Sequence, residues 1–419
     1  MKFVLICICL LNNLFSFSKE IKQLNTTTDL IKLTLYSTSS YLIANARIGS
    51  TNQQMGLILD TQRNYTSIMS DKCKTCQNII PFDSSKSKSF NLLEENYTIE
   101  MYKQQMTGRL GSDIISLDGD LLLNSSEIVL VDEINDGRNF DLQGFIGLGF
   151  TSSKEKNIIY RLKESGKIKS AVYSLLISID STSAELHLGG YDQNLLNSTN
   201  SSITWTNISY TQNDNFSNWY IQADSVYLND TLSGKNPKII LNSASNVIRL
   251  PSDFFFDNLS KIFDRRSQCQ IMKNSLFRCK CNSDYQTVFP TFKFTIDKLN
   301  NQNITISPRD YIALDNSGIQ SIDSAAYCVL FLSPNYENDY WMLGLNFMND
   351  FYTVFDIENS KVGFFNVKYL SPDGIEDVLF LSMIIVVSSI LFFSALLCVY
   401  KKLTTRPGNN QLLIQDYLR

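Results

Sequence analysis

The sequence predicts an all-β ectodomain that folds as two similar lobes. Across residues 30–367, short runs rich in β-branched and aromatic residues alternate with Asn, Ser, Asp and Gly, a pattern typical of strands joined by turns. A weak repeat divides this region, because an apolar strand runs into a short polar turn at Asp60 and again at Asn242. Later in each half, another apolar run ends in glycine, at Gly147 and at Gly344. This duplication predicts two lobes of similar architecture.

The two ends of the chain carry apolar segments that favour a membrane-anchored protein of the secretory pathway. Residues 1–18 contain a lysine, an apolar run too short to span a bilayer and then small polar residues. They predict a cleaved signal peptide, with a buried N-terminal strand as the alternative. Residues 378–400 contain no charge, and 23 residues as a helix rise roughly 34 Å, enough to cross a hydrocarbon core of ~30 Å. This segment is therefore predicted to be a C-terminal transmembrane helix.

The charges beside that span predict its orientation. Lys401, Lys402 and Arg406 follow it and acidic residues precede it, so the positive-inside rule places the tail, residues 401–419, in the cytosol. Eleven Asn-x-Ser/Thr sequons lie upstream of the span and none lies beyond it, which agrees with a glycosylated ectodomain that is extracellular or lumenal. We expect a type I single-pass protein of the cell surface or of an endolysosomal membrane.

The ectodomain is expected to divide near residue 200. Residues 19–200 would form an N-terminal β lobe, and residues 201–370 would form a C-terminal β lobe. Residues 192–218 are rich in Asn and Ser and carry four of the sequons, as is typical of an exposed connector. We therefore expect the two halves of the repeat to lie in separate lobes.

The cysteines predict disulfides. Six of them lie outside the predicted signal and membrane segments, and an even number in an oxidising compartment favours pairing. These six are Cys73, Cys76, Cys269, Cys279, Cys281 and Cys328. A zinc site is the alternative, but the spacings do not match a paired Cys-x-x-Cys cluster and the chain has one histidine. We predict no metal site and no cofactor, and the pairing of the last four cysteines stays open.

Composition excludes several classes of function. The chain has 419 residues, of which 44% are hydrophobic and 19% are charged, so it is long enough for two folded domains. Its net charge is −4 and it lacks a long basic run, which excludes nucleic acid as an expected partner. The single histidine, His187, lies in a strand-like stretch where a half-exposed side chain is expected, and no Gly-x-Ser-x-Gly motif occurs. Hydrolysis, if present, would have to rely on carboxylates.

The order of the segments resembles the pepsin-like aspartic protease family. That family is bilobal, and each lobe supplies an apolar-apolar-Asp-Thr/Ser-Gly turn and a closing apolar-apolar-Gly segment. The first half offers GLILDTQ and QGFIGLGF, and the second half offers KIILNSAS and YWMLGLNF. The resemblance extends over nearly the whole ectodomain. It implies a cleft between the two lobes that holds an extended peptide or protein.

The resemblance places the two catalytic positions at Asp60 and Asn242. In the family both are aspartates that share a proton: one activates a water while the other protonates the carbonyl oxygen of the substrate. An amide has nearly the shape of a carboxylate but cannot ionise, so Asn242 cannot exchange roles with Asp60. Losing one general acid or base typically costs on the order of 10²–10⁴ in rate. We therefore expect catalysis to be impaired.

Further positions follow from the same resemblance. Thr61 and Ser243 carry the hydroxyls that in the family reach across and link the lobes. Tyr102 falls on the tyrosine of the flap that covers the cleft, although a half-buried strand tyrosine is the alternative.

Other residues near the catalytic turns depart from the family pattern. Gln62 and Ala244 replace glycines at positions where the backbone packs tightly. Arg63 stands where a small hydroxyl residue is usual, and Ser67 replaces the tryptophan that partners the flap tyrosine.

These features predict a catalytically impaired aspartic-protease homologue on a membrane, whose cleft still binds an extended peptide as an added strand. Two alternatives stay open. The first is an active membrane-anchored aspartic endopeptidase, and the second is a glycosylated surface or adhesion module.

Overall fold

The structure of the protein is a computed structural model. Residues 1–366 form one compact unit, and residues 367–419 form a second, of which only Val367 is described. The predicted signal peptide, membrane span and cytosolic tail all lie outside the described residues. No helix in the described part of the chain is long and apolar enough to cross a membrane. The structure describes residues 30–38, 40–101, 104–118, 121–135, 142–150, 157–177, 183–198, 202–209, 218–259, 269–272, 276–281, 285–297, 302–315, 327–336 and 338–367.

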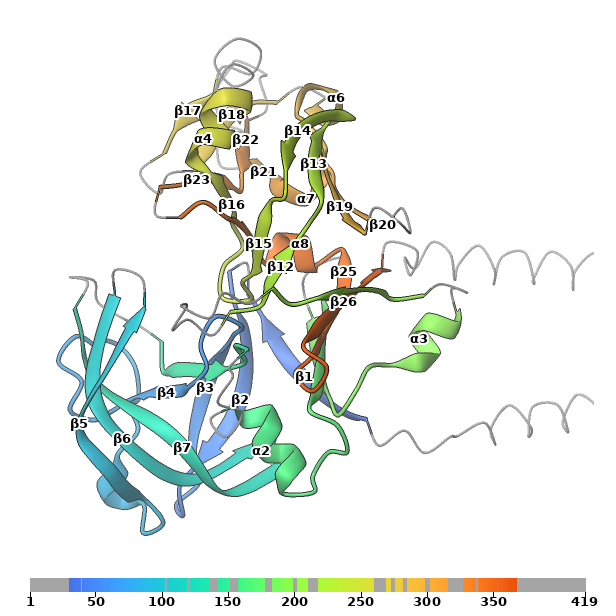
Figure 1. The fold of residues 1–419 in the computed structure, drawn as a ribbon. Coiled ribbons are helices and arrows are strands. Elements are labelled where there is room, and N and C mark those ends of the chain that lie inside the picture. The colour runs from blue at the N-terminus through green and yellow to red at the C-terminus, as the bar shows by residue number, and fades with distance from the viewer. Residues whose placement is uncertain are drawn as a thin grey trace, which may run out of the picture. The chain divides into compact units, whose positions relative to one another are not determined.

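A large sheet dominates the first half of the chain (Figure 1). Within the described residues it has 13 strands, in the order β11-β26-β25-β9-β10-β1-β2-β3-β8-β4-β7-β6-β5. Their bounds in chain order are β1 (Ile31–Ser37), β2 (Leu42–Ile48), β3 (Gln53–Asp60), β4 (Thr66–Met69), β5 (Asn91–Met101), β6 (Gln104–Leu117), β7 (Leu121–Ile134), β8 (Gly144–Gly147), β9 (Val172–Ile177), β10 (Ser183–Leu188), β11 (Thr204–Asn207), β25 (Phe351–Asp356) and β26 (Lys361–Asn366).

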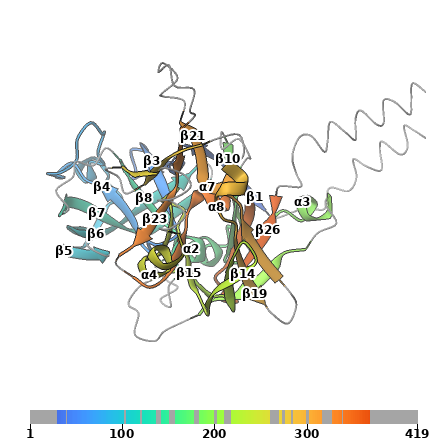
Figure 2. The same cartoon turned by 90° about the horizontal axis from the view of Figure 1, so that it is seen from above.

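Smaller sheets make up most of the second half, of which β11, β25 and β26 belong to the large sheet. Across the described ranges their orders are β12-β15-β24-β16-β23, β14-β13-β19-β20 and β17-β18-β22-β21. Figures 1 and 2 both show β14 and β19 well apart from β5, β6 and β7. The strand bounds are β12 (Tyr220–Gln222), β13 (Ser225–Leu228), β14 (Thr231–Lys235), β15 (Lys238–Leu241), β16 (Ile248–Pro251), β17 (Gln270–Ile271), β18 (Phe277–Lys280), β19 (Phe292–Asp297), β20 (Gln302–Ile306), β21 (Ile312–Asp315), β22 (Tyr327–Leu330), β23 (Leu332–Asn335) and β24 (Trp341–Leu343).

The helices in the described residues are short. The longest, α2, begins after Asn157, whose side chain caps it by accepting a hydrogen bond from the backbone N–H of Ile159. The helical segments are η1 (Ser84–Lys86), α2 (Ile158–Glu164), α3 (Gln193–Ser198), α4 (Ser252–Phe254), η3 (Phe255–Leu259), α6 (Tyr285–Val288), α7 (Pro308–Tyr311) and α8 (Leu345–Met348). The all-β prediction is therefore confirmed in a coarser form, because the protein is mostly β with short helices.

One strand-pairing pattern occurs twice. In the first half, β3 runs parallel to β8, which is antiparallel to β4, which in turn is parallel to β7. In the second half, β15 runs parallel to β24, which is antiparallel to β16, which is parallel to β23. The strands β3 and β15 are those that end at the two polar turns of the sequence repeat. The weak repeat thus corresponds to a duplicated three-dimensional motif.

Glycine closes each copy of this motif. A Cβ atom added at Gly147 would lie less than 3.0 Å from the carbonyl oxygen of Tyr65, and one added at Gly344 would lie equally close to that of Ser245. In both copies the backbone that would clash belongs to the turn after the first strand of the motif, β3 or β15. No side chain fits between these two pieces of backbone, so glycine is required for the close approach.

Candidate active site

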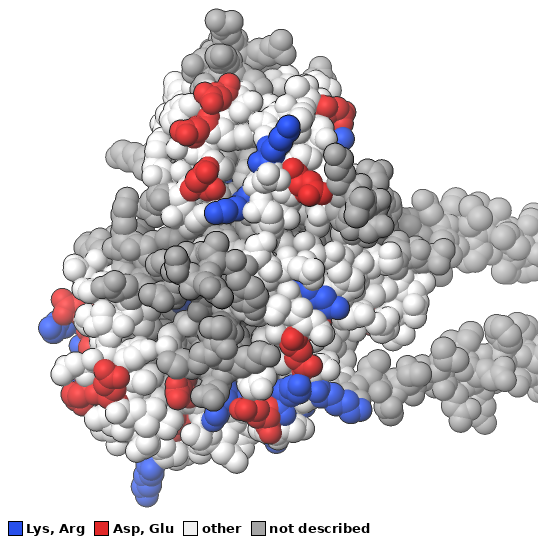
Figure 3. Space-filling model, in the orientation of Figure 1, with Lys and Arg blue, Asp and Glu red and all other residues white. Residues whose placement is uncertain are grey.

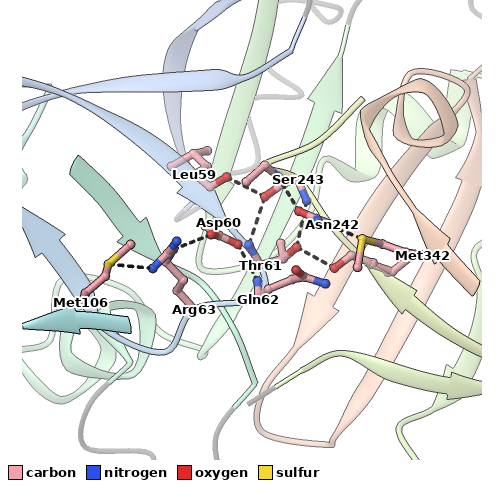
Figure 4. Close-up of polar contacts among 11 residues, drawn as sticks. Leu59, Asp60, Thr61, Gln62, Arg63, Met106, Asn242, Ser243 and Met342 are labelled. Atoms are coloured by element: carbon pink, nitrogen blue, oxygen red, sulfur yellow. Dashed lines mark hydrogen bonds and ion pairs between the residues drawn. The ribbon is translucent and has the colours of Figure 1, made fainter. Parts of the chain in front are cut away.

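The two candidate turns contact each other (Figure 4). Asp60 ends β3, and Asn242 directly follows β15; their exposed fractions are 3% and 7%. The Asp60 carbonyl accepts a hydrogen bond from Leu148 N at 2.9 Å, and Asn242 N donates to the Leu343 carbonyl at 2.9 Å. Each turn is therefore held by the closing segment of its own half.

The two turns are joined by four hydrogen bonds in a two-fold pattern. Thr61 Oγ1 donates to the Leu241 carbonyl at 2.8 Å and accepts from Ser243 N at 3.0 Å. Ser243 Oγ donates to the Leu59 carbonyl at 2.7 Å and accepts from Thr61 N at 3.1 Å. Both hydroxyls are fully buried, so water does not compete for these bonds. The resemblance predicted a linking role for these two residues, and these contacts join the two halves of the chain.

An aromatic cluster holds the closing segment that supports the first turn. The carbonyl of Leu148 accepts hydrogen bonds from Tyr173 Oη at 2.7 Å and from Trp219 Nε1 at 2.9 Å. Both rings pack against Phe355, with centroid distances of 4.6 and 5.0 Å. Burial raises the pKa of Tyr173 well above its ordinary value, so its hydroxyl stays protonated as a donor. This cluster fixes the segment that in turn holds Asp60.

Both oxygens of the Asp60 carboxylate are engaged. Oδ1 accepts from Gln62 N at 2.8 Å, and Oδ2 accepts from Arg63 Nε at 2.8 Å. The Arg63 guanidinium is buried, lies 4.1 Å from the ring centroid of Phe145 and donates through Nη1 to Met106 Sδ at 3.4 Å. Burial lowers the pKa of Arg63, while the charge and hydrogen bond of Asp60 oppose that effect. The centre therefore carries an ion pair with no net charge.

The second turn presents an amide in the equivalent place. Asn242 Oδ1 accepts from Ala244 N at 2.9 Å, which repeats the bond from Gln62 N to Asp60 Oδ1. Its Nδ2 donates to Met342 Sδ at 3.2 Å, and a thioether is a weak acceptor. Asn242 thus takes the position and turn geometry of a carboxylate without its charge.

Sequence reasoning did not foresee the role of Arg63. It identified the residue as a departure from the family pattern but not as the ion-pair partner of Asp60. The available signal was the spacing of three residues between an acid and a base. Met106 and Met342, which contact the two turns through sulfur, were also missed. Methionines inside apolar strands are typical of a core, and nothing in the sequence distinguishes these two.

Two buried polar atoms at this centre lack a hydrogen-bond partner in the described structure: Gln62 Nε2 and Ser67 Oγ. Both residues occur where the sequence departs from the family pattern. Gln62 is 8% exposed and Ser67 is fully buried. An unsatisfied buried group of this kind is costly, so each needs an explanation.

The predicted flap tyrosine, Tyr102, lies outside the described residues. The hairpin that would carry it is present, because β5 and β6 pair from Asn91 and Ser112 to Met101 and Gln104. On this hairpin the ring of Tyr97 packs edge-on against Tyr65, with centroids 5.9 Å apart, and burial raises its pKa.

The six cysteines form three disulfides, which confirms the prediction of pairing and decides the partners left open. They are Cys73–Cys76, Cys269–Cys279 and Cys281–Cys328.

The expectation of a half-exposed His187 was wrong. The side chain lies on β10 and is fully buried, because the neighbouring β9 and β25 bring Tyr352 against it. Its Nδ1 lies 2.6 Å from Tyr352 Oη, and its Nε2 lies 2.7 Å from Glu185 Oε2. Burial lowers the pKa of His187, and the nearby Glu185 carboxylate opposes this.

The charged side chains form no strong field on the face shown in Figure 3. Acidic and basic side chains are interspersed there, and neither sign gathers into a patch.

Known proteins place this chain in a family. The family model for eukaryotic aspartyl protease matches residues 40–367. The aspartic-type endopeptidase ctsD of Aspergillus fumigatus is 26% identical over 78% of this chain, and the match spans 66% of that relative. Gastricsin of Oryctolagus cuniculus is 25% identical, over 76% of this chain and 79% of its own length. Plasmepsin IV of Plasmodium falciparum is 26% identical, over 77% of this chain and 69% of its own length. With a mostly-β duplicated fold and a family match over most of its length, the chain belongs to the eukaryotic, pepsin-like aspartyl protease family.

Proposed function

We propose that this protein holds an extended peptide without cleaving it, as a catalytically impaired aspartyl-protease homologue anchored in a membrane of the secretory pathway. One observation carries the loss of catalysis. The Asp60 carboxylate is paired with the buried Arg63 cation, and an amide occupies the place of the second carboxylate.

The chemistry of the family explains why this arrangement prevents turnover. Peptide hydrolysis needs one carboxylate to take a proton from a water and a second to give a proton to the carbonyl oxygen. At Asp60, Oδ2 accepts from the buried Arg63 guanidinium and Oδ1 accepts from Gln62 N, so the carboxylate is engaged in an ion pair and has no second carboxylate with which to share a proton. The amide of Asn242 cannot act as a general acid. The proton-sharing pair that the mechanism needs is therefore missing.

Peptide binding is supported by what the scaffold retains. The scaffold retains the duplicated strand motif. It also retains four hydrogen bonds that keep the two halves together: two join Thr61 and Ser243 to each other, and two join their hydroxyls to backbone carbonyls of the opposite half. The relatives named as endopeptidase, gastricsin and plasmepsin belong to a family that takes peptides as substrates. An extended peptide that adds a strand to an exposed edge gains affinity from main-chain hydrogen bonds, without any need for catalysis.

An active endopeptidase remains the second candidate, because Asp60 is retained and the relatives carry protease names. The deciding experiment incubates the full-length protein, purified in detergent, with a denatured protein from pH 3 to 7. We expect no cleavage by the wild type or by Asp60→Ala, together with measurable binding of a labelled extended peptide.

Three results would lead elsewhere. Cleavage by the wild type that Asp60→Ala abolishes would establish the endopeptidase. Neither cleavage nor peptide binding by a folded protein would favour a surface or adhesion module. Extraction of the protein from membranes by carbonate alone would contradict anchoring through residues 378–400.

A further inference from the structure

The amide nitrogen of Gln62 is a buried donor beside the two turns that has no hydrogen-bond partner in the described structure. Its side chain extends from the first turn toward the second-half turn (Figure 4). Only 8% of the residue is exposed. A buried donor left unpaired loses its hydration without compensation, so a native chain rarely keeps one unless another molecule supplies the acceptor.

A second amide donor lies in the opposite turn with only a weak partner. Asn242 Nδ2 donates to the thioether of Met342 at 3.2 Å, and sulfur of this kind is a poor acceptor. Two amide donors, one from each turn, therefore lack a strong acceptor. A centre that in an active enzyme would offer carboxylate oxygens here offers donors.

The charge at this centre limits which acceptor fits. Asp60 and Arg63 neutralise each other at 2.8 Å, and Gln62 and Asn242 are uncharged. A ligand carboxylate would have to lose its hydration without meeting an unpaired cation, which is costly. A neutral carbonyl oxygen loses far less hydration and can accept from an amide donor.

We propose that Gln62 Nε2, assisted by Asn242 Nδ2, donates to a backbone carbonyl oxygen of an uncleaved peptide at the centre of the site. This inference rests on the proposed function, because it names the ligand group that the site recognises. It assigns Gln62 as a specificity-determining residue. Gln62, which stands where the family has a glycine, thus recognises the carbonyl of a peptide bond that is not cleaved.

Apolar side chains lie on both sides of the centre and suggest the probe. The cluster in the first half includes Met106 and Phe145, which contact Arg63, and the cluster in the second half includes Ile240, Met342 and Tyr340. A suitable probe is a hexapeptide analogue with Leu and Phe flanking its centre. Its central bond is replaced either by a ketomethylene group, –CO–CH2–, or by an ethylene group, –CH2–CH2–. The two probes are neutral and not cleavable, and they differ only in the carbonyl.

The test measures dissociation constants of both probes by isothermal titration calorimetry on the full-length protein in detergent. For the wild type we expect the ketomethylene probe to bind about tenfold more tightly than the ethylene probe. In Gln62→Leu, which keeps the side-chain bulk but removes the donor, this ratio should fall to about two or less. Gln54→Leu on the exposed side of β3 is the matched control and should keep the wild-type ratio.

Several outcomes would overturn the inference. Equal wild-type affinities for the two probes would mean that the amide holds only a water, while peptide binding itself would stand. A tenfold ratio that persists in Gln62→Leu would assign the carbonyl to another donor. If Gln62→Leu does not fold, Gln62→Gly, which restores the family residue, takes its place with the same criteria. Failure of the folded wild type to bind either probe would overturn both this inference and the proposed function.

Discussion

The turn at residues 60–63 and the turn at residues 242–245 have the same hydrogen-bonding pattern but different chemistry. In both, the side-chain oxygen of the first residue accepts a hydrogen bond from the backbone N–H two residues later. In both, the second residue of the turn, Thr61 or Ser243, donates a hydrogen bond from its buried hydroxyl to a backbone carbonyl of the opposite half. The first turn keeps its carboxylate but pairs it with Arg63, whereas the second turn replaces its carboxylate with Asn242.

This difference separates what folding requires from what catalysis requires. The glycines and hydroxyls shared by both halves fill steric and hydrogen-bonding roles in the core, where few substitutes fit. The second turn does not require a carboxylate, because an amide of the same shape accepts the same backbone hydrogen bond. The proposed loss of catalysis is therefore compatible with a duplicated motif that persists.

Repair of both turns together should have the largest effect. We expect the variant that combines Asn242→Asp with Arg63→Ser to cleave a denatured protein at mildly acidic pH on the order of 10²–10⁴ faster than either single variant. The reason is that each single change leaves the other half blocked. A fluorescent protein-digestion assay from pH 3 to 7 measures the rates. Adding Asp60→Ala should abolish the gain, and equal activity of Asn242→Asp alone would refute a blocking role for Arg63.

Removal of the two central side chains should distinguish the halves by stability. Asp60→Ala leaves the Arg63 guanidinium buried without a counter-charge, which should lower the free energy of unfolding by about 3–5 kcal/mol. Asn242→Ala removes only a neutral amide and should cost about 1–2 kcal/mol. Urea unfolding of both variants measures the contrast. Adding Arg63→Met to Asp60→Ala should recover much of the loss, and equal losses in the two single variants would contradict the ion pair.

The closing glycines should, in contrast, behave alike. Gly147→Ala and Gly344→Ala both place a methyl group against backbone, so each should lower the free energy of unfolding by about 2–3 kcal/mol. Gly190→Ala is the control, because its new Cβ would lie 3.7 Å from its nearest neighbour, Leu30 Cδ1, and should change stability by less than about 0.5 kcal/mol. Thermal or urea unfolding measures all three. A large difference between Gly147→Ala and Gly344→Ala would break the equivalence of the two motifs.

The sheet that joins the halves should contribute a smaller, pH-dependent effect. Burial lowers the pKa of His187, so the unfolded chain, with a histidine pKa near ~6.5, takes up the proton first as the pH falls. The stability that neutral His187 contributes is therefore present above about pH 6.5 and is lost as the pH falls from there through the folded-state pKa. Between pH 7 and pH 5, the free energy of unfolding should fall more steeply for the wild type than for His187→Gln. Parallel pH profiles would show that folding does not lower the pKa of His187.

Much of the fold was predictable, because its signals are local. Strand-like runs, turn residues and the repeat around Asp60 and Asn242 depend on short stretches of sequence. The even number of cysteines predicted disulfides, but not which cysteines pair. The strands β18 and β22 lie side by side and place Cys279 opposite Cys328, yet Cys279 pairs with Cys269 and Cys328 pairs with Cys281. The burial of His187 was missed for a similar reason, since it depends on Tyr352, which lies 165 residues away.

The sequence by itself determined the family, the duplicated motif and the amide at Asn242, because each depends on residue identity and order. Only the tertiary structure decided what the remaining side chains do. Arg63 neutralises Asp60, and Gln62 Nε2 is left without an acceptor. Both outcomes depend on the exclusion of water from these side chains by the packing of segments that are far apart in the chain.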